Sequence, residues 1–575
     1  MRAWALAVLT VLPLAAQNVR PAARPLDPAE LRLPAGFEIA IYARNLRSAR
    51  MLAFSPTGVL FVSDQGGRVL AVPEAGRAQV FASGLRQPHG LAFRGNDLYV
   101  AENHRIIVYR NATHPSLTAG APEVIADLPS AGGGHSTRTI LFDTEGKLVA
   151  TAGSTCNICN ESDPRRAAAM RFNADGTGME IFARGLRNSV GIAVHPVTGE
   201  IWATDNGGDN QGDDQPPEEI NILRPGRDYG WPRCYGEGAR YPGFSGDCSA
   251  VERAELNMQA HSAPLGMGFY TGEMFPAQYR NDALVAFHGS WNRNQPTGYK
   301  VVRIRASGGR AAGIEDFLTG FLRLPTTSGR PVHAATGPDG ALYVSDDQNG
   351  MVYRISYAGP RATPEGLVSA AAATIATAPG ALVSLYGANL KAQASQAASL
   401  PLPGNLDDAI VLVNDAPAPL LYAGPQQVNF QMPFGVEGKA RVAVKNRQAT
   451  DTLEVDVRRT APAIFTQDQS GAGLGAIRQS GRTLEIYCTG LGEVSPAVAS
   501  GVGAPQSPLA RAVAPVTVTI DGLTADVLFA GLTPDFAGLY QVNATVPAQA
   551  RTGRRVTVVV TAGGAASNAV EVALN

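Results

Sequence analysis

The stretch GIAVHPVTGEIWATDNG, residues 191–207, decides the fold class. Apolar residues alternate with others on both sides of the turn Thr198-Gly199-Glu200, which is the pattern of a β-hairpin. An apolar strand, a Gly-containing turn and a second strand recur in MLAFSPTGVLFVSDQGGRVLAV (51–72), GLAFRGNDLYVAENHRIIVYR (90–110), TILFDTEGKLVATAG (139–153), DALVAFHGSW (282–291) and AATGPDGALYVSDDQNGMVYRI (334–355). Repetition about every 40 to 90 residues is typical of propeller blades, so residues 31–358 are predicted to form a six-bladed β-propeller.

Composition agrees with an all-β chain. The 575 residues include 63 Gly and 40 Pro, a share above average that fits many short strands joined by turns. A helical bundle is excluded by the same turn-rich composition. Lys and Arg number 48 against 49 Asp and Glu, so the net charge of -1 argues against a nucleic-acid partner.

A second repeat follows the predicted propeller. Residues 359–379, rich in Ala, Pro and Thr, are predicted to be a linker. Beyond them, LLYAGPQQVNFQMP from Leu420 matches VLFAGLTPDFAGLYQVNATVP from Val527, and ALVSLYGANL from Ala381 matches TLEIYCTGLG from Thr483. We therefore predict two immunoglobulin-like β-sandwich domains, residues 380–465 and 466–575. They resemble the TIG modules and duplicated tails of exported bacterial proteins. They would fit a role in spacing or in attachment to a surface or a carbohydrate.

The first residues predict export. Residues 1–16, MRAWALAVLTVLPLAA, have an early charge, a short apolar run and a small-residue end, as in a signal peptide cleaved near Ala16. No later stretch approaches the roughly 20 apolar residues of a transmembrane segment. The mature protein is therefore predicted to be secreted or periplasmic, where disulfides are stable.

Five cysteines fit that compartment. Cys234 and Cys248 flank a loop-like segment and would most simply pair with each other. Cys156 and Cys159 form a CxxC that is followed by Asn and not by His, so the haem-attachment motif is absent. A short structural disulfide is the preferred interpretation. Cys488 is left over and is predicted to be a buried thiol in a strand.

Three segments at the mouth of the predicted propeller have chemically useful side chains. In AGGGHSTRTILF (131–142), His135 follows three glycines and is a candidate general base, although a lone His is often structural. In FARGLRNSVGIAVHP (182–196), Arg187 and Asn188 could bind a carboxylate or order the loop. The third segment, residues 203–232, suits calcium or is a solvated acidic loop. Its acidic residues are Asp205, Asp209, Asp213, Asp214, Glu218 and Glu219.

These segments, in this order, resemble the soluble quinoprotein glucose/sorbosone dehydrogenase family, whose members use pyrroloquinoline quinone (PQQ) and calcium to oxidise aldoses or other sugars. The most specific stretch is GLRNSVGIAV followed by EEINILRPGRDYGWP. The resemblance implies that His135 is the base that takes the proton of the sugar hydroxyl. It also implies that Arg187 and Asn188 contact the quinone, and that Arg330 in SGRPVHAATGPDG holds a PQQ carboxylate.

The same resemblance implies two calcium sites. The carbonyl groups of Gly207 and Gly208 would ligate the calcium that polarises PQQ. Glu219 and Tyr229 match ligands of a second, structural calcium.

The chain also departs from the family pattern. A second arginine for the PQQ carboxylates falls on Val332, and the quinone-binding lysine aligns near FHGSWNR, where Arg293 is the substitute. Gly134 precedes the catalytic His in place of an Asp, and residues 260–264 lack the aromatic wall of a glucose pocket. These departures weaken glucose as the substrate and favour the sorbosone-dehydrogenase-like branch.

Three functional hypotheses remain. The leading one is an exported PQQ-dependent sugar dehydrogenase that passes electrons to an external acceptor, since the chain has no haem motif. The second is a calcium-dependent lactonase-type propeller hydrolase, which would surround one central metal with carboxylates from different blades. The third is a non-catalytic secreted carbohydrate-binding propeller.

Overall fold

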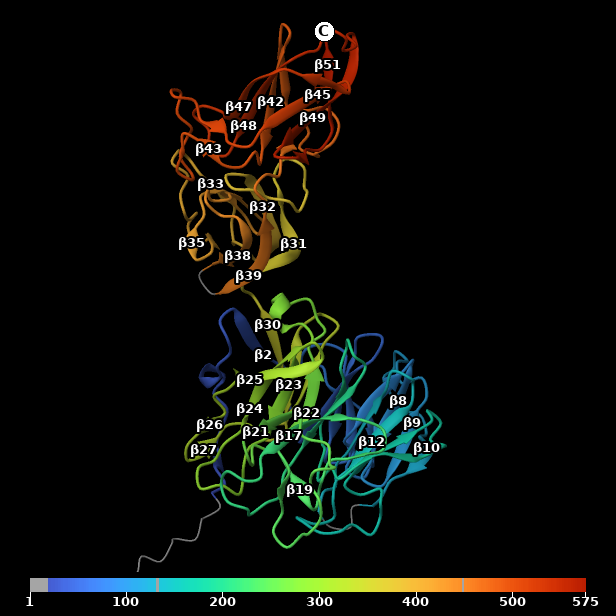
Figure 1. Cartoon of the computed structure of the whole chain (residues 1–575). Helices are drawn as coiled ribbons and strands as arrows, with labels where there is room; N and C mark the ends of the chain where they lie inside the picture. Colours follow the sequence, from blue (N-terminus) through green and yellow to red (C-terminus); the bar gives the residue numbers. More distant parts are fainter. Residues whose placement is uncertain (1–18, 131–133, 447–448) are drawn as a thin grey trace, which may run out of the picture. The chain divides into compact units, whose positions relative to one another are not determined.

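The computed structural model describes residues 19–575 except 131–133 and 447–448 (Figure 1). The predicted signal peptide, residues 1–16, lies outside the described residues. The chain divides into two compact units, Met1–Tyr357 and Ala358–Asn575. The described residues contain strands and two short 3₁₀ helices, η1 (Pro28–Glu30) and η2 (Ala277–Tyr279), and no α-helix, so the all-β prediction is confirmed. No helix among them is long and apolar enough to cross a membrane.

The described part of the first unit contains six sheets of four or five strands, built on the antiparallel hairpins that the sequence predicts. Their strands are β3 to β6 (Ala49–Phe54, Leu60–Asp64, Arg68–Val72, Gln79–Ser83), β7 to β10 (Leu91–Arg94, Asp97–Ala101, Arg105–Tyr109, Glu123–Asp127), β11 to β14 (Arg138–Phe142, Leu148–Ala152, Ala168–Phe172, Glu180–Arg184) with β18 (Arg227–Asp228), β15 to β17 (Ile192–Val194, Ile201–Asp205, Glu218–Leu223) with β21 (Leu256–Met258), β22 to β25 (Pro264–Phe269, Ala283–Phe287, Lys300–Ser307, Arg310–Leu318), and β28 to β30 (Pro331–Thr336, Leu342–Asp346, Met351–Tyr357) with β2 (Phe37–Ala43).

The two ends of the first unit share one sheet. Strand β2, blue in Figure 1, precedes the first sheet in sequence but pairs with β30 in the last. The register places Phe37 opposite Tyr357 and Ile39 opposite Ile355. An early strand that completes the last sheet is how propeller rings close, and the fold is propeller-like.

Four of these sheets repeat one polar contact. The second strand of the hairpin ends at, or one residue before, the acid of VSD, VAE, ATD or VSD. The acidic side chain accepts a hydrogen bond from a backbone N–H of the loop that precedes the hairpin. The four acids are Asp64, Glu102, Asp205 and Asp346. Asp205 thereby holds the N–H groups of Arg187 and Asn188, and Asp346 holds that of Arg330. The blade repeat itself therefore positions three of the predicted site residues.

Small elements and disulfides complete the first unit. The small elements are the sheet of β1 (Ala22–Ala23), β26 (Leu322–Arg323) and β27 (Thr326–Thr327), and the hairpin of β19 (Cys234–Tyr235) and β20 (Ala239–Arg240). Disulfides join Cys156 to Cys159 and Cys234 to Cys248, which confirms both predicted pairs. Cys488, in the second unit, is a free and fully buried cysteine, also as predicted.

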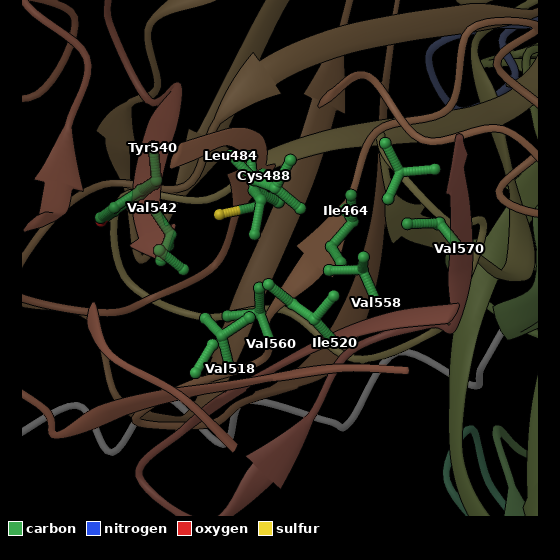
Figure 2. Packing of buried hydrophobic residues seen from close by; sticks show 14 of the residues in the cluster. Ile464, Leu484, Cys488, Val518, Ile520, Tyr540, Val542, Val558, Val560 and Val570 are labelled. Carbon is green, nitrogen blue, oxygen red and sulfur yellow. The ribbon is translucent and has the colours of Figure 1, made fainter. Parts of the chain in front are cut away.

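The second unit has two consecutive cores, each between two sheets. The first uses β31 to β39 (Arg361–Ser369, Leu382–Ala388, Ser395–Gln396, Ile410–Val413, Ala416–Pro417, Leu420–Ala423, Gln427–Gln431, Gly438–Lys445, Thr450–Val457). The second uses β40 to β51 (Ala463–Ile464, Ile477–Ser480, Thr483–Thr489, Val494–Ser495, Arg511–Ala512, Val516–Ile520, Leu523–Ala525, Val527–Leu532, Tyr540–Thr545, Arg554–Ala562, Ala565–Ala566, Val570–Leu574). Figure 2 shows Leu484 and Val542 of one sheet in the same cluster as Val518 and Val560 of the other.

The predicted linker is not free of structure. Residues 359–379 contain β31, which pairs with β32 and belongs to the first of these sheets. Its register shifts between Ala362 and Leu367, so the alternation of side chains that marks a strand is broken in the sequence. The matching QVN triplets, by contrast, lie in equivalent strands. Gln427 donates to Asn429 at 2.7 Å, and Gln541 donates to Asn543 at 2.8 Å.

Candidate functional site

A cavity of about 200 Å³ in the first unit brings together five residues predicted from the sequence: His135, Arg187, Asn188, Gly207 and Arg330. They come from the loops before β11, before β15, between β16 and β17, and before β28, which belong to three different sheets. The remaining lining residues are Asn206, Asp209, Glu218, His261, Ala263, His288, Gly289, Trp291 and Asn292. Cationic and neutral donors therefore face two carboxylates across a small polar cavity.

His135 is held in one orientation by Ser154. Its Nδ1 lies 3.1 Å from the carbonyl oxygen and 3.1 Å from the hydroxyl oxygen of Ser154. Nε2 has no hydrogen-bond partner among the described residues. Burial, followed by the charge of Arg187, lowers the pKa of His135 to about 3, so the ring is neutral at ordinary pH. A neutral imidazole with one unengaged nitrogen can accept a proton from a ligand in the cavity.

Arg187 is a buried cation whose donors are taken by the protein. Its Nη2 lies 2.7 Å from Oδ2 of Asp209, and its side chain is only 4% exposed. Nη1 donates to the carbonyl of Asn206, while Nε and Nη2 donate to the carbonyl and the side-chain oxygen of Asn157. Arg187 thus supplies a fixed positive charge to the cavity wall.

Arg330 reaches the cavity from the loop before β28. Nε donates to the carbonyl of His288 at 3.0 Å, and Nη2 donates to the carbonyl of Gly289 at 3.1 Å. Its Nη1 has no partner among the described residues, and burial lowers the pKa of the group. The unengaged N–H groups can donate to a ligand carboxylate.

Gly207 and Gly208 present backbone carbonyls beside a buried carboxylate. The N–H of Gly207 donates to Glu218 at 2.8 Å, and that of Gly208 donates to the hydroxyl of Tyr241 at 3.0 Å. Neither carbonyl accepts a hydrogen bond from a described residue. Burial raises the pKa of Glu218 to about 8. Backbone carbonyl and carboxylate oxygens are the kind of ligand that calcium prefers.

Comparison with known proteins agrees with this arrangement. Residues 103–354 match the model of the glucose/sorbosone dehydrogenase family. An uncharacterized protein of Borreliella burgdorferi is 32% identical over 347 residues, which cover 57% of this chain and 91% of that protein. A PQQ-dependent sugar dehydrogenase of Hypocrea jecorina is 25% identical over 325 residues, covering 44% of this chain and 72% of that protein. The chain belongs to the glucose/sorbosone dehydrogenase family.

Solved structures agree on the fold of this glucose/sorbosone dehydrogenase domain. The holo form of the PQQ domain of a pyranose dehydrogenase from Coprinopsis cinerea superposes with a TM-score of 0.50 at 22% identity. The alignment covers 58% of this chain and 98% of that one. Since 58% of 575 residues is close to the length of the first unit, the likeness supports a propeller-like fold for that unit.

Four predicted site residues do not line the cavity of the dehydrogenase domain: Gly208, which directly follows Gly207, Arg293, and the pair Glu219 and Tyr229, which the resemblance assigned to a separate calcium site. Arg293 binds the acidic loop instead: Nη1 donates to the carbonyl of Asp213, and Nη2 lies 3.2 Å from Asp214. Glu219 accepts from Asn221 and from the N–H of Gly236. The hydroxyl of Tyr229 donates to the carbonyl of Ile222. Arg293 therefore binds one backbone carbonyl and one carboxylate of a loop about 80 residues earlier, a contact that sequence order does not reveal.

Two histidines that line the cavity, His261 and His288, were not predicted from the sequence. Nε2 of His288 lies 3.0 Å from both carboxylate oxygens of Asp347, which also binds Arg50 at 2.7 Å. Burial lowers the pKa of His288 to about 4. His261 also lines the cavity, and its Nδ1 lies 3.2 Å from Asn292. Only the motif FHGSWNR, which contains His288, offered a signal for this group.

Proposed function

We propose that the chain is an exported PQQ-dependent dehydrogenase that oxidises an aldose or related sugar and passes the electrons to an external acceptor. The observation that carries this proposal is the meeting of His135, Arg187, Asn188, Gly207 and Arg330 around one cavity. The relative from Hypocrea jecorina, a PQQ-dependent sugar dehydrogenase, supports the same chemistry. The first unit would be a six-bladed propeller, and the two cores of the second unit would be immunoglobulin-like modules for attachment.

The residues present fit both proposed groups. Arg330, with unengaged N–H groups, and the fixed charge of Arg187 suit a ligand with several carboxylates such as PQQ. The carbonyls of Gly207 and Gly208 and the carboxylate of Glu218 suit calcium. When bound beside calcium, PQQ would supply the acceptor for the hydride that leaves C1 of the sugar.

His135 would perform the proton transfer. Because Nδ1 faces two oxygens of Ser154, the proton of the neutral ring lies on Nδ1 and Nε2 carries the lone pair. Nε2 would accept the proton of the sugar C1 hydroxyl as the C–H bond breaks. The imidazolium formed in this step must then return its proton to solvent, which its low pKa favours.

The placement of the carboxylates in the cavity does not favour the lactonase hypothesis. The two carboxylates of the cavity, Asp209 and Glu218, both come from the segment between β16 and the start of β17. A hydrolase with one central metal would instead take carboxylates from different blades.

The purified mature protein tests this proposal when it is titrated with PQQ in the presence of calcium and assayed for dye reduction with a panel of aldoses. We expect saturable binding by absorbance and sugar-dependent dye reduction. Absence of PQQ binding would refute the proposal, and hydrolysis of lactones with calcium alone would replace it with the hydrolase.

A further inference from the structure

The short disulfide loop 156–159 contacts the cavity wall at several points. Asn157, the residue after Cys156, makes four hydrogen bonds to two residues that line the cavity. Its carbonyl accepts from Nε of Arg187 at 2.8 Å, and its Oδ1 accepts from Nη2 of Arg187 at 2.8 Å. The same Oδ1 accepts from the N–H of Asp209 at 2.7 Å, and Nδ2 donates to the carbonyl of Asp209 at 2.9 Å.

The two residues that Asn157 contacts, Arg187 and Asp209, also bind each other. Arg187 and Asp209 form an ion pair at 2.7 Å, and Asp209 accepts from Asn292 at 2.9 Å. Asn157 is an exposed residue, so packing in a core does not explain its orientation. Its amide contacts the guanidinium of Arg187 and the backbone of Asp209, which fixes the guanidinium relative to the backbone that carries the Asp209 carboxylate.

Neighbours of Asn157 in the same segment contact the other predicted site residues. Ser154, which orients His135, donates its hydroxyl hydrogen to the carbonyl of Cys156 at 2.7 Å. Ile158 lies against Gly208, where an added Cβ would come within 3.2 Å of its side chain. The segment 154–158 therefore touches the proposed base, the cationic wall and the proposed calcium loop.

The Cys156–Cys159 disulfide closes a loop with a sequence separation of only 3 residues. A cross-link that closes so short a loop restricts the unfolded chain less than one that closes a long loop. Its main effect is therefore local, and the local residue that needs a fixed position is Asn157. Glu161 lies within 4.8 Å of both sulfurs, but sulfurs joined in a disulfide are not thiolate ligands for a metal.

We propose that the Cys156–Cys159 loop is a positioning device for the cavity, in which Asn157 is the positioning residue that holds Arg187 and Asp209. The effect of this loop on PQQ binding rests on the proposed function. The hydrogen bonds from Asn157 to Arg187 and Asp209 do not, because they are present in the protein without any ligand. Loss of Asn157 or of the disulfide leaves the fold intact but lets the Arg187–Asp209 pair move, and PQQ then binds more weakly.

The primary test compares Asn157→Ala with Asn173→Ala by hydrogen exchange in the protein without PQQ. Asn173 is a matched control, since it also makes side-chain hydrogen bonds in the same sheet region, to Lys147 and Thr177, outside the cavity. We expect amide exchange in the peptide that contains Asp209 to be at least tenfold faster in Asn157→Ala and unchanged in the control. Asn157→Asp, which keeps the Oδ1 acceptor, should restore part of the protection. Unchanged exchange in Asn157→Ala would overturn the proposal.

A PQQ titration of the same variants gives the functional consequence. We expect Kd to rise at least tenfold in Asn157→Ala, with an unfolding midpoint close to that of the parent, and to stay unchanged in Asn173→Ala. If the parent itself binds no PQQ, the proposed function fails while the exchange experiment still decides the positioning role. If the parent binds and Asn157→Ala binds equally well, the positioning role has no effect on the site and is wrong.

The disulfide is tested in a Cys234→Ser/Cys248→Ser chain, so that Cys156–Cys159 is the only described bridge left. A dithiol reductant donates two electrons and two protons to the bridge and becomes a cyclic disulfide, while a chelator prevents metal capture by the thiols and Glu161. We expect the same faster exchange near Asp209 as in Asn157→Ala. Cys156→Ser/Cys159→Ser in the otherwise intact chain gives the same answer if the background does not fold. Unaltered exchange would remove the disulfide from the proposal.

Discussion

Nδ1 of His135 lies 3.1 Å from the hydroxyl oxygen of Ser154, which in turn donates its hydrogen to the carbonyl of Cys156 at 2.7 Å. Because that hydrogen is already used, the hydroxyl oxygen can only accept from His135. The carbonyl oxygen of Ser154 is a second acceptor at 3.1 Å. The proton of the neutral ring is therefore fixed on Nδ1, and the lone pair on Nε2 is available for catalysis.

We expect His135→Asn to lower kcat for sugar oxidation by about 10² to 10⁴, the usual contribution of a general base. Ser154→Ala is the matched variant: it removes the hydroxyl and leaves the carbonyl acceptor, so kcat should fall less than tenfold. Both are measured by dye reduction at saturating PQQ and calcium. Equal turnover in His135→Asn and the parent would exclude His135 as the base.

The environment of the His135 ring determines how kcat/KM should change at acid pH. Burial and the charge of Arg187 lower the pKa of His135 to about 3, so the base stays unprotonated well below its ordinary pKa near 6.5. We expect kcat/KM to show no loss attributable to His135 between pH 8 and pH 5. The measurement is the initial rate of dye reduction across that range. A fall of the rate in the parent with an apparent pKa near 6.5 would contradict this assignment.

Glu218 should make stability depend on pH in the opposite direction to an ordinary carboxylate. Burial raises its pKa from 4.5 to about 8, so between these values the folded chain binds a proton that the unfolded chain does not. The free energy of unfolding gained from this group is present below pH 4.5 and is lost as pH rises toward 8. We expect Glu218→Gln to show a flatter dependence than the parent in urea unfolding between pH 5 and pH 8, both without calcium. Parallel curves for the two chains would show that Glu218 does not titrate there.

Asp205 should affect function as well as stability. It accepts hydrogen bonds from the N–H groups of Arg187 and Asn188 at 2.8 and 2.6 Å, and Asp64 occupies the equivalent place in the first sheet. We expect Asp205→Ala and Asp64→Ala each to lower the free energy of unfolding by about 2 to 4 kcal/mol, because buried donors lose their acceptor. Only Asp205→Ala should also weaken PQQ binding. The comparison requires chemical unfolding and a PQQ titration of both variants, and equal affinity in the two would contradict a role for Asp205 at the site.

Local patterns explain what the sequence could predict. Residues 191–207 contain their own hairpin alternation and turn, and the acid at the end of ATD binds the loop that carries Arg187 only 18 residues earlier. Such short-range relations repeat from sheet to sheet, so the all-β class could be predicted from the residues. His135 and Arg187 were candidates from their own segments, whereas the role of Arg330 was implied by the family resemblance alone. The strand β31 could not, because the bulge in it disrupts the alternation.

Contacts between distant segments explain what was missed. Arg50 and Asp347 are 297 residues apart and meet only because the sheets come together, so their contact with His288 has no local signature. The family resemblance predicts Arg293 at the quinone, but its guanidinium donates to the backbone carbonyl of Asp213 and to the carboxylate of Asp214, 80 and 79 residues before it. Asn157 was hidden inside a CxxC whose cysteines drew attention to redox or metal chemistry.

Trp291 is predicted to contact the sugar. It lines the cavity yet is 45% exposed, an unusual position for a large aromatic side chain that no partner covers among the described residues. A ring at the mouth can pack against the C–H face of a sugar and contributes to binding more than to hydride transfer. We therefore expect Trp291→Ala to raise KM for the sugar about tenfold while kcat and the Kd for PQQ change less than twofold. Trp291→Phe keeps an aromatic surface and should recover most of the affinity. A loss of PQQ binding in Trp291→Ala would instead place the ring against the cofactor, and unchanged KM would show that the sugar enters by another side of the cavity.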